Sequence, residues 1–156
     1  MILIRLTYFS RSRLDQNLES HDARVHEIAR AAAINNCRDD ITAALICDDR
    51  WFAQVIEGRE SIVSLTFERI LRDQRHCDVS LVTMQPIAER RYADYAMVTI
   101  PRGEDNDDLF RHYCEDQHFD PRQMRADRLC DLIEAVVQRG AKGAQSWTTA
   151  SATSAA

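Results

Sequence analysis

Hydrophobic and polar positions predict a strand, a helix and a β-hairpin in the first third of the chain. Apolar residues alternate with polar ones over residues 2–9, which is typical of a strand with two different faces. Over residues 18–34 the apolar positions recur at helical spacing, and Asn35–Asn36 ends that pattern. Two apolar runs, residues 41–47 and 51–56, then flank three polar residues, which indicates a hairpin.

The rest of the chain predicts five further elements and a tail. They are a helix over 61–74, strands over 79–87 and 92–100, a short acidic helix over 105–115, an amphipathic helix that begins at Asp120–Pro121 and stops at Gly140, and a tail over 141–156 rich in Ala, Ser and Thr.

This order of elements predicts an α+β fold with a ferredoxin-like βαββαββ layer. Two helices would cover one face of a mainly antiparallel sheet, and the C-terminal helices would cover the other face. We therefore expect a sheet domain over 1–100, a helical extension over 101–140 that packs on the sheet, and a disordered tail over 141–156.

Composition narrows the class of protein. The chain has 156 residues, of which 45% are hydrophobic, and this suits one domain with a sizeable core. The formal net charge of -5 argues against a nucleic-acid-binding module. No apolar run is long enough to cross a membrane, and the start is too short for a signal peptide, so we expect a cytoplasmic protein.

Cysteine and histidine spacings favour neither a disulfide framework nor a metal site. The five cysteines are odd in number and show no C-x-x-C spacing, so reduced thiols are expected. Cys114 and His118 are four residues apart and could share a helix face, with His112 nearby. Two ligands without a third at sensible spacing do not make a zinc site, so no metal is expected.

Gln54 is the residue whose chemistry most needs a partner, because it lies in the middle of an apolar strand. Alternation places it on the same face as Phe52 and Ile56. A buried amide left unpaired costs about 1–3 kcal/mol. The first and third strands of a ferredoxin-like layer are neighbours, so the Tyr8 hydroxyl can meet this amide on the helix-covered side. That contact has two interpretations, a structural hydrogen bond or part of a ligand site.

Polar and cationic residues near the ends of the first two helices predict a cleft for a planar heterocycle. An asparagine amide can donate to a carbonyl and accept from the adjacent N–H, and arginine can hold a further carbonyl or a phosphate. Ile28 and Ile70 would supply apolar walls. The polar set is Asn35, Asn36, Arg69, Asp73, Arg75 and His76. The structural alternatives are a helix stop, a surface ion-pair set and core packing.

The combination resembles the BLUF family of blue-light sensors that use flavin. The segments that carry the resemblance are Tyr8, Asn35–Asn36, the F-x-Q-x-I-E-G run Phe52–Gly58, the run Arg69–His76 with its D-x-R-H end, and Tyr95–Met97. The resemblance covers about residues 1–100, with all segments in register.

The resemblance implies a flavin between the two helices, usually FAD, with FMN and riboflavin as alternatives. It implies that Ile28 and Ile70 flank the ring, that Asn36 pairs with the C4 carbonyl and N3–H edge, and that Arg75 reaches the C2 carbonyl. Further cofactor contacts would come from Asn35, Phe52, Gln54, Arg69, Asp73 and His76.

The resemblance also implies roles for a photochemical pair and for two transmitting residues. In the family, blue light is thought to draw an electron and a proton from the tyrosine, here Tyr8. The glutamine, here Gln54, then rotates or tautomerises and changes its hydrogen bonding to the flavin C4 carbonyl. Many relatives have tryptophan where this chain has Tyr95, and the flexible Met97 on the same predicted face would feel the change in Gln54.

We therefore expect a photoreceptor without a catalytic output domain, one that forms a homo-oligomer and signals to a separate partner. By analogy with short family members, that partner would be a cyclic-di-nucleotide phosphodiesterase or a transcriptional regulator. The alternative is a small hydrolase of the acylphosphatase type, for which Ser10–Arg13 offers arginines but no glycine-rich anion loop. A module of RNA-recognition shape is disfavoured by the acidic composition.

Overall fold

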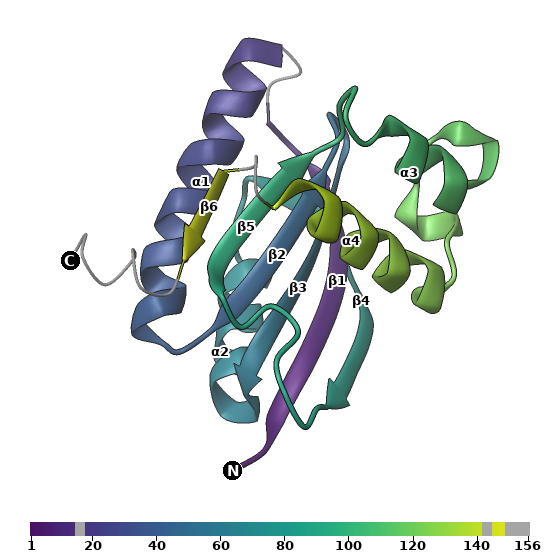
Figure 1. Ribbon diagram of the computed structural model, residues 1–156. Helices are drawn as coiled ribbons and strands as arrows, with labels where there is room; N and C mark the ends of the chain where they lie inside the picture. The colour runs from purple at the N-terminus through teal and green to yellow at the C-terminus, as the bar shows by residue number, and fades with distance from the viewer. Residues whose placement is uncertain (15–17, 142–144, 149–156) are drawn as a thin grey trace.

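A mixed sheet forms the centre of the protein (Figure 1). The computed structural model describes residues 1–14, 18–141 and 145–148. The strands are β1 (Leu3–Ser12), β2 (Thr42–Cys47), β3 (Trp51–Arg59), β4 (His76–Pro86), β5 (Tyr95–Pro101) and β6 (Gln145–Thr148). Their order across the sheet is β4-β1-β3-β2-β5-β6, in which β2 and β5 run parallel and the other neighbouring pairs run antiparallel.

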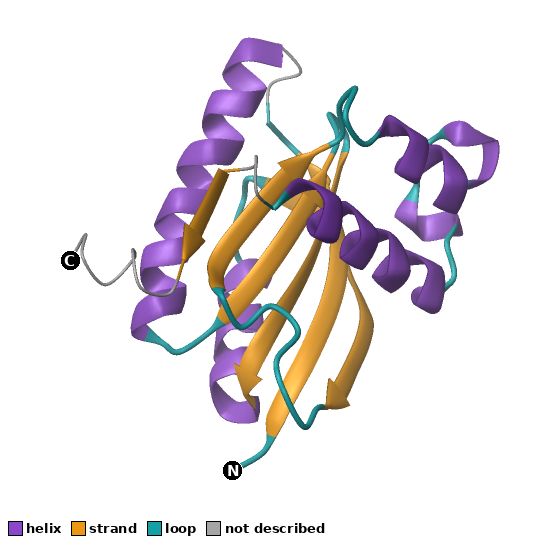
Figure 2. Ribbon diagram, viewed as in Figure 1, coloured by secondary structure: helices purple, strands orange, loops and turns teal. Residues whose placement is uncertain are grey.

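Helices cover both faces of this sheet (Figure 2). On one face lie α1 (Leu18–Arg38) and α2 (Glu60–Leu71), and on the other lie the short α3 (Asp107–Tyr113) and α4 (Ala126–Gly140), with the 3-10 turns η1 (Glu115–Gln117) and η2 (Pro121–Gln123) between them. The predicted ferredoxin-like α+β class is confirmed. None of the described helices combines the length and the apolarity that a membrane crossing requires.

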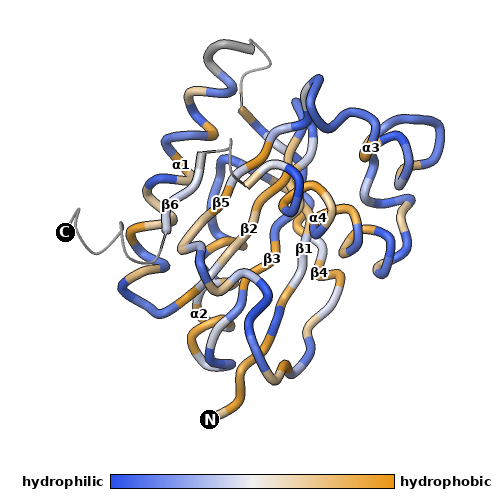
Figure 3. Tube along the Cα trace, viewed as in Figure 1, coloured by the Kyte–Doolittle hydropathy of each residue, from blue (hydrophilic) through white to orange (hydrophobic). Residues whose placement is uncertain are grey.

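The strands divide their side chains between two hydrophobic cores, one on each face. On β3, Phe52 and Ile56 pack on the side of α1 and α2, whereas Ala53 and Val55 pack on the side of α4. Figure 3 shows the hydrophobic segments gathered in the strands and α4, while the chain around α3 is mostly hydrophilic. Alternation places Gln54 on the side of α1 and α2, as the sequence predicted.

Asn35–Asn36 does not end the first helix, which continues to Arg38. The residue that takes the left-handed conformation is Asp40, with a φ of 55°. Asn36 stays in the helix because its buried side chain makes a tertiary contact: its Nδ2 donates to the carbonyl oxygen of Ala96 at 2.8 Å. A long-range hydrogen bond thus overrides the local preference of asparagine for a helix end.

Asp120–Pro121 caps a different element from the one predicted. The Asp120 carboxylate accepts a hydrogen bond from the backbone N–H of Arg122 at 3.1 Å, and this starts η2 rather than the last helix. The long helix α4 begins only at Ala126 and ends at Gly140, the predicted stop.

Part of the predicted tail is an edge strand. β6 pairs antiparallel with β5, and its Trp147 packs against the core on the side of α1 and α2. The pattern missed it because a strand of four residues is too short for alternation to show. Residues 142–144 and 149–156 of the predicted tail lie outside the described residues.

A buried carboxylate anchors the segment that leads into β5. Glu57 has an exposed fraction of 0% and accepts hydrogen bonds from Arg5 Nε at 2.7 Å and from the backbone N–H groups of Arg91 and Tyr92 at 3.0 Å each. One side chain of β3 therefore ties β1 to the loop before β5.

Replacing Glu57 by alanine is expected to lower the free energy of unfolding by about 3 kcal/mol, because the Arg5 side chain, 12% exposed, would lose its counter-ion and the backbone N–H groups of Arg91 and Tyr92 would lose their acceptor. Urea titration of the variant measures the loss. The matched control is Glu68→Ala on the exposed face of α2, for which a change within about 0.5 kcal/mol is expected. Equal stability of the two variants would contradict the anchoring role of Glu57.

Candidate functional site

A buried hydrogen bond joins the two central strands on the side of α1 and α2. Tyr8 lies directly opposite Gln54 in the antiparallel pairing of β1 with β3. Both are buried, and the Tyr8 hydroxyl donates to the Oε1 atom of Gln54. Burial, with a smaller contribution from the negative charge of Asp73, raises the pKa of Tyr8 well above its usual value. The phenol is therefore held as a neutral donor.

The Tyr8–Gln54 pair forms part of a cleft between α1, α2 and the sheet, with a cavity volume of about 230 Å³. The cleft brings together all the predicted cofactor-binding residues, namely Ile28, Asn35, Asn36, Phe52, Gln54, Arg69, Ile70, Asp73, Arg75 and His76. Ala29, Ala31 and Ala32 of α1 also line it. Because alanines project little from a helix, the slot between α1 and the sheet can admit a flat group.

Two carboxamides present unused hydrogen-bonding groups to this cleft. Within the described chain, the hydrogen bond from Tyr8 is the one contact made by the side-chain amide of Gln54, so its nitrogen keeps both protons for another acceptor. The Asn36 amide donates one N–H to the carbonyl of Ala96, and among the described residues no hydrogen bond uses its second N–H or its carbonyl oxygen. These groups can both donate to and accept from the edge of a planar ligand.

The arginines of the cleft are held by carboxylates. Arg75 donates from Nε to Asp73 Oδ1 at 2.9 Å and from Nη2 to Oδ2 at 2.5 Å, and these hydrogen bonds hold the pKa of Asp73 below its usual value. Arg69 Nη2 donates to Asp39 Oδ2 at 2.9 Å and so joins the ends of α1 and α2. The cleft rim therefore carries fixed cationic groups.

His76 is positioned by contacts with both of its ring nitrogens. Nε2 lies 2.6 Å from the carbonyl oxygen of Ile70, and Nδ1 lies 2.7 Å from the hydroxyl of Ser10. The carbonyl can only accept, so Nε2 carries a proton. His76 thus fastens the start of β4 to the end of α2 and to β1, and it lines the cleft without a free ring nitrogen.

The two residues predicted to transmit a signal lie on opposite faces of β5. Met97 is 1% exposed and lines the cleft, whereas Tyr95 packs against the core on the side of α4. Simple alternation placed both on one face and is wrong here. The register of β5 against β6 shifts between them, which leaves Ala96 as an extra, bulged residue. Met97, and not Tyr95, is the member of the pair placed beside Gln54's cleft.

Besides the alanines of α1, the cleft is lined by four residues that sequence reasoning did not assign to it: Asp39, Leu45, Ile56 and Thr66. Leu45 is paired with Gln54 across β2 and β3 and could have been found from the hairpin register. Asp39 carries no comparable signal, because its partner Arg69 is distant in sequence and the two meet only when the helix ends come together.

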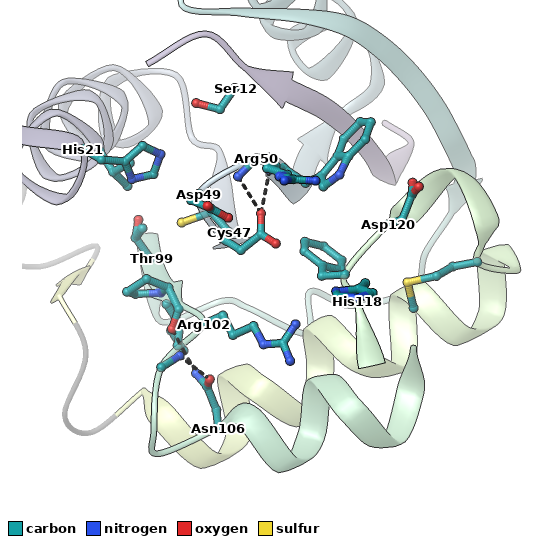
Figure 4. A pocket seen from close by; sticks show the side chains of 18 of the residues that line it. Ser12, His21, Cys47, Asp49, Arg50, Thr99, Arg102, Asn106, His118 and Asp120 are labelled. Atoms are coloured by element: carbon teal, nitrogen blue, oxygen red, sulfur yellow. Dashed lines mark hydrogen bonds between the residues drawn. The ribbon is translucent and has the colours of Figure 1, made fainter. Parts of the chain in front are cut away.

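A larger groove of about 1570 Å³ lies at the other end of α1, between the turn that joins β2 to β3 and the C-terminal helices (Figure 4). His21, Cys47 and Thr99 gather at one side of it. Burial raises the pKa of Cys47 to about 12, so its thiol stays protonated. Among the described residues, no cluster of three or more His, Cys, Asp or Glu side chains around any site could hold a metal ion.

Comparison with known proteins identifies the family of the domain that contains the cleft. The family model BLUF, described as sensors of blue-light using FAD, matches residues 3–98. The chain belongs to the BLUF family. The acylphosphatase-type alternative is left without support. The match places the cleft, the Tyr8–Gln54 pair and Met97 inside the BLUF domain.

The relatives of this BLUF chain include longer proteins, which it matches over only part of their length, and a protein of similar length. Photoactivated adenylate cyclase subunit beta of Euglena gracilis is 36% identical over 95 residues, which are 58% of this chain and 10% of that protein. The dark-state structure of the BLUF protein BlrB is 29% identical, with a TM-score of 0.72 over 88% of this chain and 96% of BlrB. Klebsiella pneumoniae BlrP1, solved with FMN and cyclic diGMP, is 29% identical, with a TM-score of 0.56 over 64% of this chain and 26% of BlrP1.

The residues of this BLUF cleft fit a flavin ring. BLUF domains bind flavin, whose ring edge alternates carbonyl acceptors with an N–H donor. The unused groups of Asn36 and Gln54 can meet both kinds of group. The volume of about 230 Å³ is smaller than that of a typical ligand cavity, roughly 300 Å³ or more, so the slot suits a ring with the rest of the molecule outside it.

Proposed function

We propose that this chain is a blue-light photoreceptor that binds FAD between α1 and α2 and signals through a change in the hydrogen bonding of Gln54. The observation that carries the proposal is the buried Tyr8–Gln54 hydrogen bond, whose amide nitrogen is left free on the side of the cleft. A structural hydrogen bond alone would not require the glutamine to line a cavity with unused donors.

The bound flavin supplies light absorption and a transient acceptor for an electron. In the dark, Tyr8 donates to Oε1 of Gln54, and the amide nitrogen of Gln54 faces the cleft. After the amide turns over or tautomerises, its nitrogen faces the Tyr8 oxygen and its oxygen side faces the cleft. Both arrangements are possible because a phenol can donate and accept, and neither leaves a net charge in the buried site.

The proposed output is a contact with a separate effector protein. Relatives join BLUF domains to an adenylate cyclase and to a protein solved with cyclic diGMP, so enzymes of cyclic-nucleotide signalling are the proposed class of partner. Met97 links the cleft to β5, and β5 lies against both α4 and β6. A change at Met97 can therefore reach the protein surface, including a surface used for self-association.

The test is the absorption spectrum of the purified chain, loaded with FAD, before and after blue light. We expect a yellow protein whose flavin bands shift to the red under illumination and return in the dark. FMN and riboflavin, loaded in parallel, establish which flavin the cleft prefers. A protein that remains colourless after incubation with all three, or a yellow protein without a reversible shift, would contradict the proposal.

The light response is expected to be independent of pH up to at least 10.0, the usual pKa of tyrosine. Because burial favours the protonated phenol in the folded protein, the stabilisation linked to Tyr8 is present below pH 10.0 and is lost only as the pH rises beyond that value. Light-minus-dark spectra recorded from pH 6 to pH 10 measure the amplitude. A loss of amplitude with a midpoint inside this interval would show that the phenol is not protected.

Replacing Asn36 by alanine is expected to weaken flavin binding by roughly five- to tenfold, because one hydrogen bond to the ring edge is worth about 1–1.5 kcal/mol. The matched control is Asn35→Ala, since Asn35 is the exposed neighbour on the same helix turn and is expected to change affinity less. Titration of the apoprotein with FAD, followed by fluorescence, measures both. Equal losses at the two positions would contradict the central place of Asn36.

A further inference from the structure

The C-terminal strand β6 lies on the edge of β5 next to the flavin cleft. In the antiparallel pairing, Trp147 is directly opposite Met97, and it packs on the same core as Met97 on the side of α1 and α2. The other flank of Trp147 meets α1, where its ring lies 5.4 Å from the ring of His26, centroid to centroid. Trp147 therefore contacts α1 on one side and is paired with β5 on the other. Figure 1 shows β6 between α1 and β5.

Met97 of β5 lines the cleft, and the neighbouring Ala96 is hydrogen-bonded to Asn36, which also lines it. The backbone carbonyl of Ala96 accepts this hydrogen bond at 2.8 Å. Ala96 is also the bulged residue at which the β5–β6 register shifts. A bulge leaves a strand easier to move than a regular ladder does. A movement of Met97 or Asn36 in the cleft would therefore act on β5 at the bulge where its pairing with β6 is irregular.

β6 is a short strand at the edge of the sheet. It has four residues, and among the described strands it pairs only with β5. Short edge strands belong to the least stable parts of a fold. The indole of Trp147 is the large apolar group of β6, and it packs on the core that contains Met97.

We propose that β6 is a latch that light releases: Trp147 positions Met97 in the dark, and the rearranged Gln54 displaces Met97 so that Trp147 loses its packing and β6 leaves the edge of β5. This inference rests on the proposed photoreceptor function and names its route of output. It differs from an output carried by α4 alone, because α4 packs on the opposite face of the sheet.

Hydrogen exchange of the FAD-loaded full-length chain, recorded by mass spectrometry in the dark and under continuous blue light, tests the latch. Peptides that contain Ser146–Thr148 are expected to exchange at least about threefold faster in light, whereas peptides over Leu81–Met84 in the opposite edge strand β4 are expected to exchange equally. The absorption spectrum of the same sample reports whether the flavin has responded.

Two variants at Trp147 complete the test. Trp147→Ala is expected to exchange in the dark as fast as the wild type does in light and to show no further effect of light, while Trp147→Phe keeps a light-dependent difference. Equal exchange of β6 in dark and light, with a normal red shift, would overturn the latch and leave the photoreceptor function standing. A light-dependent difference that persists in Trp147→Ala would overturn the role of Trp147. Absence of the red shift in the wild type would overturn both proposals.

Discussion

Replacement of Tyr8 by phenylalanine is expected to abolish the blue-light red shift while the protein keeps its flavin. The phenol is buried, is held neutral by its raised pKa and donates to Oε1 of Gln54. Phenylalanine keeps the ring that packs beside Phe67, whose centroid lies 5.6 Å away, so the cleft keeps its shape. What is lost is the one group that can first donate to the glutamine and then accept from it.

The expected size of this effect is a complete loss of the red shift, because phenylalanine offers neither a donor nor an acceptor that distinguishes the two orientations of the amide. Tyr92→Phe is the matched control. Tyr92 is also buried, but it belongs to the core on the side of α4. A normal shift in Tyr8→Phe, or an equal loss in Tyr92→Phe, would contradict the role of the Tyr8 hydroxyl.

Replacement of Gln54 by leucine is expected to remove the red shift as completely. Leucine has a similar volume and suits an apolar strand, so β3 should keep its pairing with β1 and β2. The Tyr8 hydroxyl would lose its acceptor, at a cost of about 1–3 kcal/mol. Among the described residues, no other side-chain amide is hydrogen-bonded to Tyr8, so no amide would connect the phenol to the bound ring. Flavin should remain bound through Asn36 and the apolar walls.

Light-minus-dark absorption spectra of Gln54→Leu, at matched flavin occupancy, measure this loss. The control is Gln85→Leu, a change of the same type at an exposed position on β4, where a full red shift is expected. Retained photoactivity in Gln54→Leu would show that the phenol acts on the flavin without the glutamine as intermediary.

Sequence reasoning succeeded where the alternation of side chains along a strand could be combined with the known strand order of a ferredoxin-like sheet. Alternation along the apolar run predicted the face of the sheet on which Gln54 lies. The rule that the first and third strands are neighbours then predicted its contact with Tyr8. In the structure these two residues are directly paired and hydrogen-bonded. The residues of the cleft were likewise found from their places at helix ends. Their naming as a flavin site came from the resemblance to BLUF proteins, and their individual roles remain predictions.

Sequence reasoning failed where a contact between distant segments overrode the local preference of a residue or the alternation of a strand. Asn36 was expected to end α1, but its hydrogen bond to Ala96 keeps it helical. Tyr95 was expected on the face of Met97, but the bulge at Ala96, which depends on pairing with β6, turns it to the other side. Neither effect is visible within a window of neighbouring residues, because both depend on partners that only the folded chain supplies.

The central claim is that light changes the hydrogen bond between Gln54 and the flavin, and difference infrared spectroscopy of the bound flavin tests it most directly. A carbonyl that gains a stronger hydrogen bond vibrates at lower frequency. We predict that light changes the frequency of the flavin C4 carbonyl stretch in the wild type and leaves it unchanged in Gln54→Leu. The same change in both proteins would contradict the claim.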